Sequence, residues 1–252
     1  MQACLRIAAL AAATAAGLNF AAAQSPPAVP FPGAAPARPI GPAGPSGPVP
    51  RMPDGKPDLS GLWNGQRALP NQAEPAMLPW AAALAKQRTE NYSADDPEAR
   101  CLPGGVPRAI PYHHQIVQTP TLLLILFEGN IHTYRQVFLD RREHLKVENL
   151  WYGDSIGYWE GDTLVVDTVG LNDKFWFGMG GHPHTTKLHV VEKYRRRDFG
   201  NMDIEVTIED PGAYTKPWVI KRVSTLETEI DMTEFVCNEN NQSALHLVGA
   251  GQ

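Results

Sequence analysis

Hydrophobic and polar residues alternate along most of the second half of the chain, which is the pattern of strands with one buried face. Short turns separate eight such runs, at residues 121–128, 131–139, 155–159, 163–168, 188–195, 202–208, 218–223 and 230–236. The third and fourth runs flank Glu160-Gly161-Asp162, a sequence typical of a tight hairpin turn. No helical pattern lies between the runs. The pattern predicts a mainly β fold, either an antiparallel barrel or a strongly bent sheet.

A short helical region is expected before the strands. Residues 80–91 are the best helical candidate, and Pro79 stands where a proline in the first turn of a helix is tolerated.

The N-terminal part of the chain has a different composition. Residues 1–23 contain one charged side chain, Arg6, then an apolar stretch and three alanines, which is the layout of a secretory signal peptide. A membrane anchor is the alternative, but the apolar run is shorter than the ~20 residues that span a bilayer. Residues 24–57 are rich in Pro, Ala and Gly and are expected to form a disordered linker. Residues 58–252 then form one domain, and the protein is expected to be periplasmic or secreted.

The amino-acid composition excludes some classes of binding partner. The 22 Lys and Arg against 27 Asp and Glu give a net charge of −5, which argues against nucleic acid as the main partner. No later segment is apolar enough for stable membrane insertion, and nothing indicates an oligomeric state. A small-molecule ligand or substrate remains. The chain lacks the nucleophile elbow, the phosphate loop and the dinucleotide glycine motif, which disfavours serine hydrolases of the α/β type, nucleotide enzymes and Rossmann oxidoreductases.

Two cysteines remain once the signal peptide is removed, Cys101 and Cys237. In an oxidising compartment we expect them to form a disulfide that closes a long loop.

Two resemblances bear on the fold. Gly61-x-Trp63 is similar to the Gly-x-Trp that begins the first strand of lipocalins. Together with the number of strands, it favours a calycin-like barrel, wide enough to hold one small ligand. Longer motifs resemble a family of exported bacterial hypothetical proteins: Trp-Glu-Gly-Asp-Thr-Leu-Val-Val-Asp-Thr at 159–168, Pro-His-Thr at 183–185, and the segments 153–157, 210–218 and 237–240. That resemblance implies export and no particular activity.

Strand alternation indicates which polar side chains face the core. Arg135 shares its face with Thr133 and Val137, while Glu192 and Glu234 fall among apolar residues of their own runs. Buried charges must pair, because an isolated one costs several kcal/mol. The three groups could form a buried ion network. Alternatively, they could lie at the base of a ligand cavity, with a carboxylate as acid or base and Arg135 holding an anionic or carbonyl oxygen.

Histidines cluster in residues 181–189. His184, on a loop before a strand, is expected to act as a general acid or base at the cavity rim. His182, His184 and His189 could together ligate zinc or iron, and the first two are similar to the cupin metal motif. Glu192 lies too far from His184 for that motif, so we expect no metal and no cofactor.

Other residues complete the candidate site. Asp154 joins the candidate catalytic residues, and the loop 172–181 is expected to be a lid over the cavity. The candidate ligand-binding residues are His113, Tyr134, Trp159, Asp167 and Trp176.

Several functions are compatible with this site. The first interpretation is an exported barrel that binds a small, partly apolar molecule. The alternative is a cofactor-free lyase, isomerase or hydrolase that uses His184 with an inward carboxylate and Arg135. Further alternatives are a metal-dependent enzyme and a periplasmic structural protein.

Overall fold

The computed structural model describes residues 44–108, 112–129, 133–178 and 180–239. The chain divides into two units, Met1–Ala37 and Arg38–Gln252, and every described residue belongs to the second. The predicted signal peptide lies outside the described residues. No described helix is long and apolar enough to cross a membrane.

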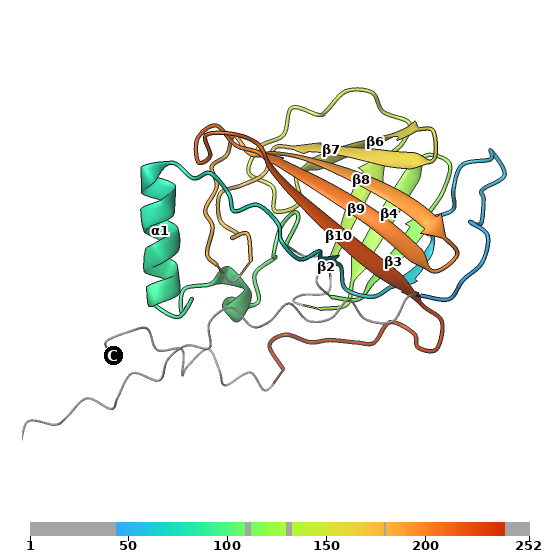
Figure 1. Cartoon of the computed structure of the whole chain (residues 1–252), viewed down its shortest axis with the longest axis horizontal. Helices are drawn as coiled ribbons and strands as arrows, with labels where there is room; N and C mark the ends of the chain where they lie inside the picture. Colours follow the sequence, from blue (N-terminus) through green and yellow to red (C-terminus); the bar gives the residue numbers. More distant parts are fainter. Residues whose placement is uncertain (1–43, 109–111, 130–132, 179, 240–252) are drawn as a thin grey trace, which may run out of the picture. The chain divides into compact units, whose positions relative to one another are not determined.

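Nine strands close into a barrel (Figure 1). They are β1 (Gly61–Trp63), β3 (His114–Gln118), β4 (Leu122–Phe127), β5 (Thr133–Phe138), β6 (Asp154–Glu160), β7 (Thr163–Val169), β8 (His189–Asp198), β9 (Asn201–Glu209) and β10 (Trp218–Glu227). Closure occurs at β1, which pairs with both β3 and β10, and the two-residue strand β2 (Arg67–Ala68) extends the pairing of β10. The predicted mainly β, antiparallel barrel is confirmed, and its form is consistent with a calycin-like barrel.

The seam between β5 and β6 differs from the others. These strands are parallel and pair at only two positions, Val137 with Ser155 and Phe138 with Ile156. Every other neighbouring pair within the barrel is antiparallel. Parallel neighbours need a crossover connection, and residues 139–153 provide it here.

The barrel has two unlike ends. The tight turns between β6 and β7 and between β8 and β9 lie at one end, which we call the turn end (Figure 1). The long loops 170–188 and 210–217 lie at the other, the loop end. Helix α1 (Pro79–Glu90) belongs to the loop end, because the Trp80 indole N–H donates to the Gly212 carbonyl at 2.9 Å. The 3-10 helix η1 (Pro97–Arg100) follows it.

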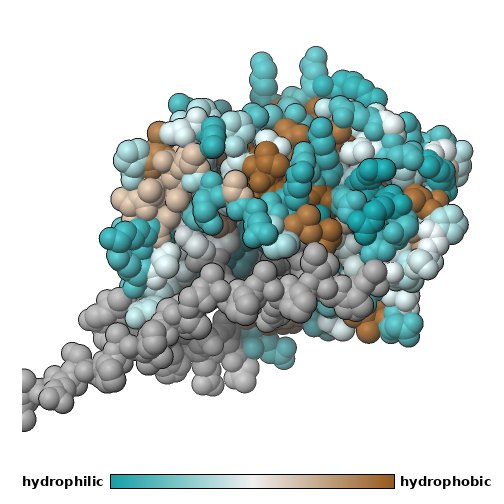
Figure 2. Space-filling model, viewed as in Figure 1, coloured by the Kyte–Doolittle hydropathy of each residue, from teal (hydrophilic) through white to brown (hydrophobic). Residues whose placement is uncertain are grey.

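Side chains alternate between the inside and outside of the barrel as the pattern predicts. Strand β9 buries Met202, Ile204, Val206 and Ile208 and turns its acidic residues outward. Figure 2 shows the outer face of the strands, where hydrophobic residues are scattered among hydrophilic ones. The buried side chains form one core that fills the barrel and includes Trp63.

Seven of the eight predicted runs contain strands, and the predicted helix is confirmed. The eighth is wrong: residues 230–236 form no strand, and Ile230, Met232 and Val236 are exposed. Both edges of β10 are already occupied, by β9 on one side and by β1 and β2 on the other. Residues 228–239, which we call the C-terminal segment, therefore cannot pair with β10 as the next strand. The sequence analysis also missed β2 and β3.

The C-terminal segment is held by the predicted disulfide, which is confirmed between Cys101 and Cys237. It is also anchored at Thr233, whose backbone N–H donates to Glu128 at 2.8 Å.

The last part of the predicted linker packs on the barrel. Gly44 N–H donates to Asn201 Oδ1 at 3.0 Å, and Phe199 N–H donates to the Gly47 carbonyl at 2.9 Å. Arg51 forms an ion pair with Asp162 at 2.8 Å. The expectation of a disordered linker up to residue 57 is therefore wrong for residues 44–57, because these residues find partners at the turn end.

Candidate ligand-binding site

Arg135 and Glu192 meet inside the barrel, as predicted. Arg135 Nη1 lies 2.6 Å from Glu192 Oε2, and the two side chains are 1% and 0% exposed. Arg135 also donates from Nε to Ser155 Oγ at 3.1 Å and from Nη2 to Thr168 Oγ1 at 2.7 Å. Its position on β5 and that of Glu192 on β8 both follow from strand alternation.

Neighbouring side chains contact both carboxylate oxygens of Glu192. The Tyr194 hydroxyl donates to Glu192 Oε1 at 2.7 Å, while Glu192 Oε2 lies in ion-pair contact with Arg135. Burial first, and the adjacent Glu192 charge second, raise the pKa of Tyr194 and keep it a hydrogen-bond donor. This geometry favours the interpretation of a buried ion network.

Glu234 does not join this pair, which corrects the sequence-based expectation. It is exposed in the C-terminal segment, outside any strand. The apolar alternation around it has no structural counterpart, since the segment crosses the outside of a barrel that is already closed.

His184 lies inside the protein and not at an exposed rim, a second correction. It is 4% exposed, and its ring packs 4.1 Å from Phe175 and 4.8 Å from Phe177 between centroids. Its Nδ1 faces the Thr185 carbonyl at 3.3 Å, and its Nε2 is buried with no hydrogen-bond partner among the described residues. Burial lowers the pKa of His184, so the ring is neutral at neutral pH.

The three histidines of residues 181–189 have separate environments. His182 packs edge-on against Trp218, with ring centroids 5.4 Å apart, whereas His189 lies outside the barrel beside Asp167. Within the described residues, no three His, Cys, Asp or Glu side chains are arranged to hold a metal ion. The cupin-like spacing therefore brings no metal-binding group together there.

Asp154 and Asp167 belong to a network on the outer face of β6, β7 and β8. His144 bridges them, with Nδ1 3.0 Å from Asp154 and Nε2 3.0 Å from Asp167. His189 continues the network from Asp167 at 2.9 Å to Glu209 at 3.4 Å. Because His144 lies on the crossover 139–153, the network fastens that connection to the barrel wall. The sequence analysis assigned no role to His144.

The network should make stability depend on pH. The hydrogen bond that His189 donates to Asp167, opposed by burial, raises the pKa of His189. The contribution of His189 to stability is therefore complete below about pH 6.5 and is lost as the pH rises through the raised value. Burial alone would raise the pKa of Asp154, but Arg141 and His144 lower it, so its contribution disappears only as the pH falls through that lowered value, below about 3.9.

In His189→Gln, we expect the free energy of unfolding no longer to fall as the pH rises. The change should be about 1 kcal/mol or less, because the pair of His189 and Asp167 is partly exposed. Urea unfolding between pH 5 and 9 measures it, with Lys187→Gln as an exposed control outside the network. An unchanged alkaline slope in His189→Gln would contradict this assignment.

The remaining predicted ligand-binding residues are dispersed. His113 pairs with Glu128 at 2.9 Å, and Tyr134 is 57% exposed on the outer face of β5, because its neighbour Arg135 points inward. Trp159 packs against the core. Trp176 is buried beneath Arg88, whose guanidinium carbon lies 4.1 Å from the ring centroid. These residues line no common cavity in the described part of the chain.

A cavity of about 330 Å³ opens at the loop end, and we call it the mouth cavity. Trp218, Ile220 and Arg222 line one side, because alternate residues of β10 face inward. Phe177 and His182 line the other side, where they pair across the loop 177–182. Trp218 contacts both rings edge-on, with its centroid 6.2 Å from that of Phe177. The predicted lid loop thus forms a wall of the cavity.

Two guanidinium groups reach the mouth cavity, and they differ in their partners. Arg108 is paired with Asp96 at 2.6 Å and Glu98 at 2.9 Å. Arg222 donates from Nη1 to the Pro107 carbonyl at 2.9 Å and has no carboxylate within ion-pair distance among the described residues, although the charge of Glu192 acts on it from farther away. Burial lowers the pKa of Arg222. The sequence analysis did not identify the residues that line the mouth cavity, although alternation in the run 218–223 places Trp218, Ile220 and Arg222 on one face.

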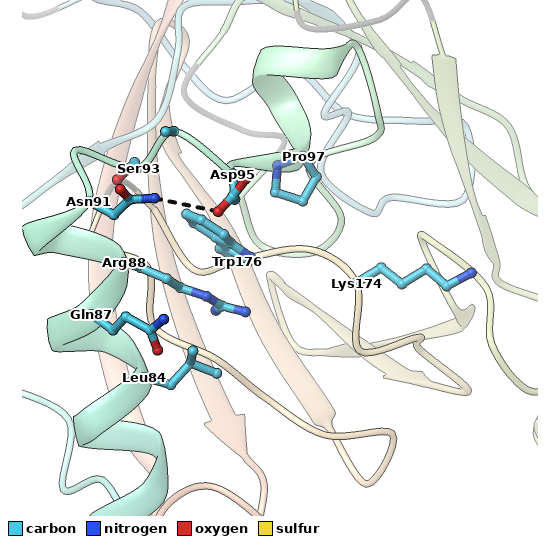
Figure 3. Close-up of a pocket in the computed structure, with 10 residues that line it drawn as sticks. Leu84, Gln87, Arg88, Asn91, Ser93, Asp95, Pro97, Lys174 and Trp176 are labelled. Atoms are coloured by element: carbon cyan, nitrogen blue, oxygen red, sulfur yellow. Dashed lines mark hydrogen bonds between the residues drawn. The ribbon is translucent and has the colours of Figure 1, made fainter. Parts of the chain in front are cut away.

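A second cleft, of about 300 Å³, lies between α1 and the loop that carries Trp176 (Figure 3). The Arg88 side chain extends from α1 beside the Trp176 indole, and Arg88 Nη1 donates to the Gly181 carbonyl at 2.9 Å. Arg88 therefore fastens the loop 177–182 from outside the mouth cavity.

A larger groove of about 430 Å³ lies on the outer face of β8, β9 and β10, where exposed charges pair with one another, as Lys221 does with Glu205 at 3.7 Å.

Fold and site together define a closed, calycin-like β-barrel with an aromatic cavity at its loop end. No protein-family model and no curated protein matches the chain. Among solved structures, an asparagine-to-alanine mutant of the fluorescent protein UnaG is similar at 12% sequence identity and a TM-score of 0.32, over 68% of this chain and 97% of that one. The resemblance to exported bacterial hypothetical proteins stays a prediction.

Proposed function

We propose that this protein is exported and binds a small, partly apolar molecule in the mouth cavity. The observation that carries the proposal is the cavity itself, a concave site of about 330 Å³ with Phe177, Trp218 and Ile220 in its walls and few polar groups. Ligand sites usually have such a composition and a volume of about 300 Å³ or more.

Export is supported by the basic, apolar and small-residue order of residues 1–23. Fractionation of cells that express the full chain tests it. Recovery of the unprocessed protein in the cytoplasm would contradict export.

The enzyme interpretation has less support from the geometry. Glu192 is already engaged by Tyr194 at Oε1 and by Arg135 at Oε2, and His184 is enclosed by two phenylalanine rings. Neither group lines the mouth cavity. Binding is therefore the function that the arrangement supports best.

Filling the mouth cavity should prevent binding. Ala68 lies exposed at its edge on β2, so Ala68→Trp adds an indole to the cavity without disturbing the core. We expect the dissociation constant of the neutral fluorescent probe N-phenyl-1-naphthylamine to rise by about tenfold or more, which corresponds to about 1.4 kcal/mol. Probe fluorescence measures it.

The control for bulk is Val219→Trp, which adds the same side chain to the exposed outer face of β10. This variant should bind the probe as the unmodified protein does. If Ala68→Trp binds equally well, the ligand site is not the mouth cavity.

A further inference from the structure

Arg222 is the one cation lining the mouth cavity that has no carboxylate in ion-pair contact in the described part of the chain. Its guanidinium has five N–H donors, and the structure gives it one acceptor, the uncharged Pro107 carbonyl. The carboxylate inside the barrel, Glu192, is already used by Arg135 and Tyr194. Glu192 acts on Arg222 only through space, so no described carboxylate is in contact with Arg222 where it meets the cavity.

The other charges near the mouth cavity are paired or face away from it. Arg108 is paired with Asp96 and Glu98, and neither carboxylate lines the cavity. Burial lowers the pKa of His182, so its ring is neutral at neutral pH. The side chains that line the cavity thus include one guanidinium, that of Arg222, with no carboxylate in contact.

An uncompensated guanidinium in partly buried surroundings is unfavourable until an anion pairs with it. A carboxylate or sulfonate can accept two parallel N–H bonds from a guanidinium, an interaction stronger than a neutral hydrogen bond. Phe177, Trp218 and Ile220 offer apolar contact on the remaining sides.

We infer that the ligand is an amphipathic organic acid, with its acidic group on Arg222 and its apolar body against Trp218 and Phe177. The inference rests on the proposed function and names the class of ligand. It distinguishes this cavity from one that selects by apolar contact alone.

Two probes with one skeleton test it: 8-anilino-1-naphthalenesulfonate, which is anionic, and N-phenyl-1-naphthylamine, which is neutral. We expect the protein to bind the anionic probe at least about tenfold more tightly. Arg222→Gln should weaken the anionic probe by about tenfold to a hundredfold and leave the neutral probe within about twofold. Both probes should lose affinity in Ala68→Trp.

Lys221→Gln is the matched control. It removes the same charge from the adjacent residue, which is exposed on the outer face and pairs with Glu205. Its probe affinities should be unchanged. Circular dichroism shows whether Arg222→Gln is folded.

Competition against the neutral probe gives a second measurement that needs no variant. Decanoate should displace it at lower concentration than decanol. If the two compete equally, or if Arg222→Gln binds both probes as the unmodified protein does, the inference is overturned while the mouth cavity stands as a neutral site. If neither probe binds the unmodified protein, the proposed function fails and the inference with it.

Discussion

Replacing Arg135 by Met should lower the free energy of unfolding by about 3–5 kcal/mol. The substitution leaves Glu192 charged, or forces it to protonate, in a position that is 0% exposed. It also removes the donors to Ser155 and Thr168. Equilibrium unfolding in urea, followed by tryptophan fluorescence, measures the change. Glu192→Leu should cost a similar amount, because it leaves the guanidinium without its anion.

The double variant Arg135→Met with Glu192→Leu distinguishes the cost of an unpaired buried charge from the cost of replacing the two side chains. Because an apolar pair has no charge to desolvate, we expect the double variant to be more stable than either single one. Arg195→Met on β8 is the control: its side chain is exposed, so it should change stability by about 0.5 kcal/mol at most. A cost for Arg135→Met below about 1 kcal/mol, or strictly additive costs, would show that the pair is not a buried network.

Strand alternation located this pair from sequence because a barrel has only two faces, and an ionisable residue in phase with Val137 or Val190 must point inward. The same rule applied to residues 218–223 identifies the inward side of β10, including Arg222. What it cannot identify is the function of an inward cation. That depends on whether a carboxylate from another strand reaches it, as Glu192 reaches Arg135.

The alternation pattern gave a wrong prediction where it was applied without asking whether a neighbouring strand still had a free edge. The segment around Glu234 alternates as a strand does, but β1 completes the barrel beside β10 and leaves no edge of β10 free. This information lies in the register between Leu62 and Glu227, far apart in the chain, and not in the segment itself. The network at Asp167 was missed for a similar reason, because its partner His144 arrives on a long crossover.

The position of His184 shows a further limit. Its distance along the chain from β8 suggested an exposed loop. Phe175 and Phe177 from the same loop fold over the ring and bury it. Loop packing of this kind depends on tertiary contacts, which a periodic pattern does not record.

Removing the disulfide should have the second large effect. Cys101→Ala with Cys237→Ala should lower the free energy of unfolding by about 2–5 kcal/mol, because the bond joins residues 136 apart in sequence and restricts the unfolded chain. We also expect the C-terminal segment to leave the barrel, since the interactions of Glu128 with Thr233 are mostly exposed. Thermal unfolding and limited proteolysis measure these two effects.

The unmodified protein treated with a reductant is the control, because it tests the bond without changing a side chain volume. Reduction and the double variant should agree in stability, and both should expose residues 228–239 to protease before the barrel is cut. The variant Thr233→Ala, with the disulfide intact, tests the hydrogen bonds to Glu128 apart from the disulfide. It should change the free energy of unfolding by about 1 kcal/mol or less. If reduction leaves both stability and the cleavage pattern unchanged, residues of the segment hold it without the bond, and closure of the long loop contributes little to this fold.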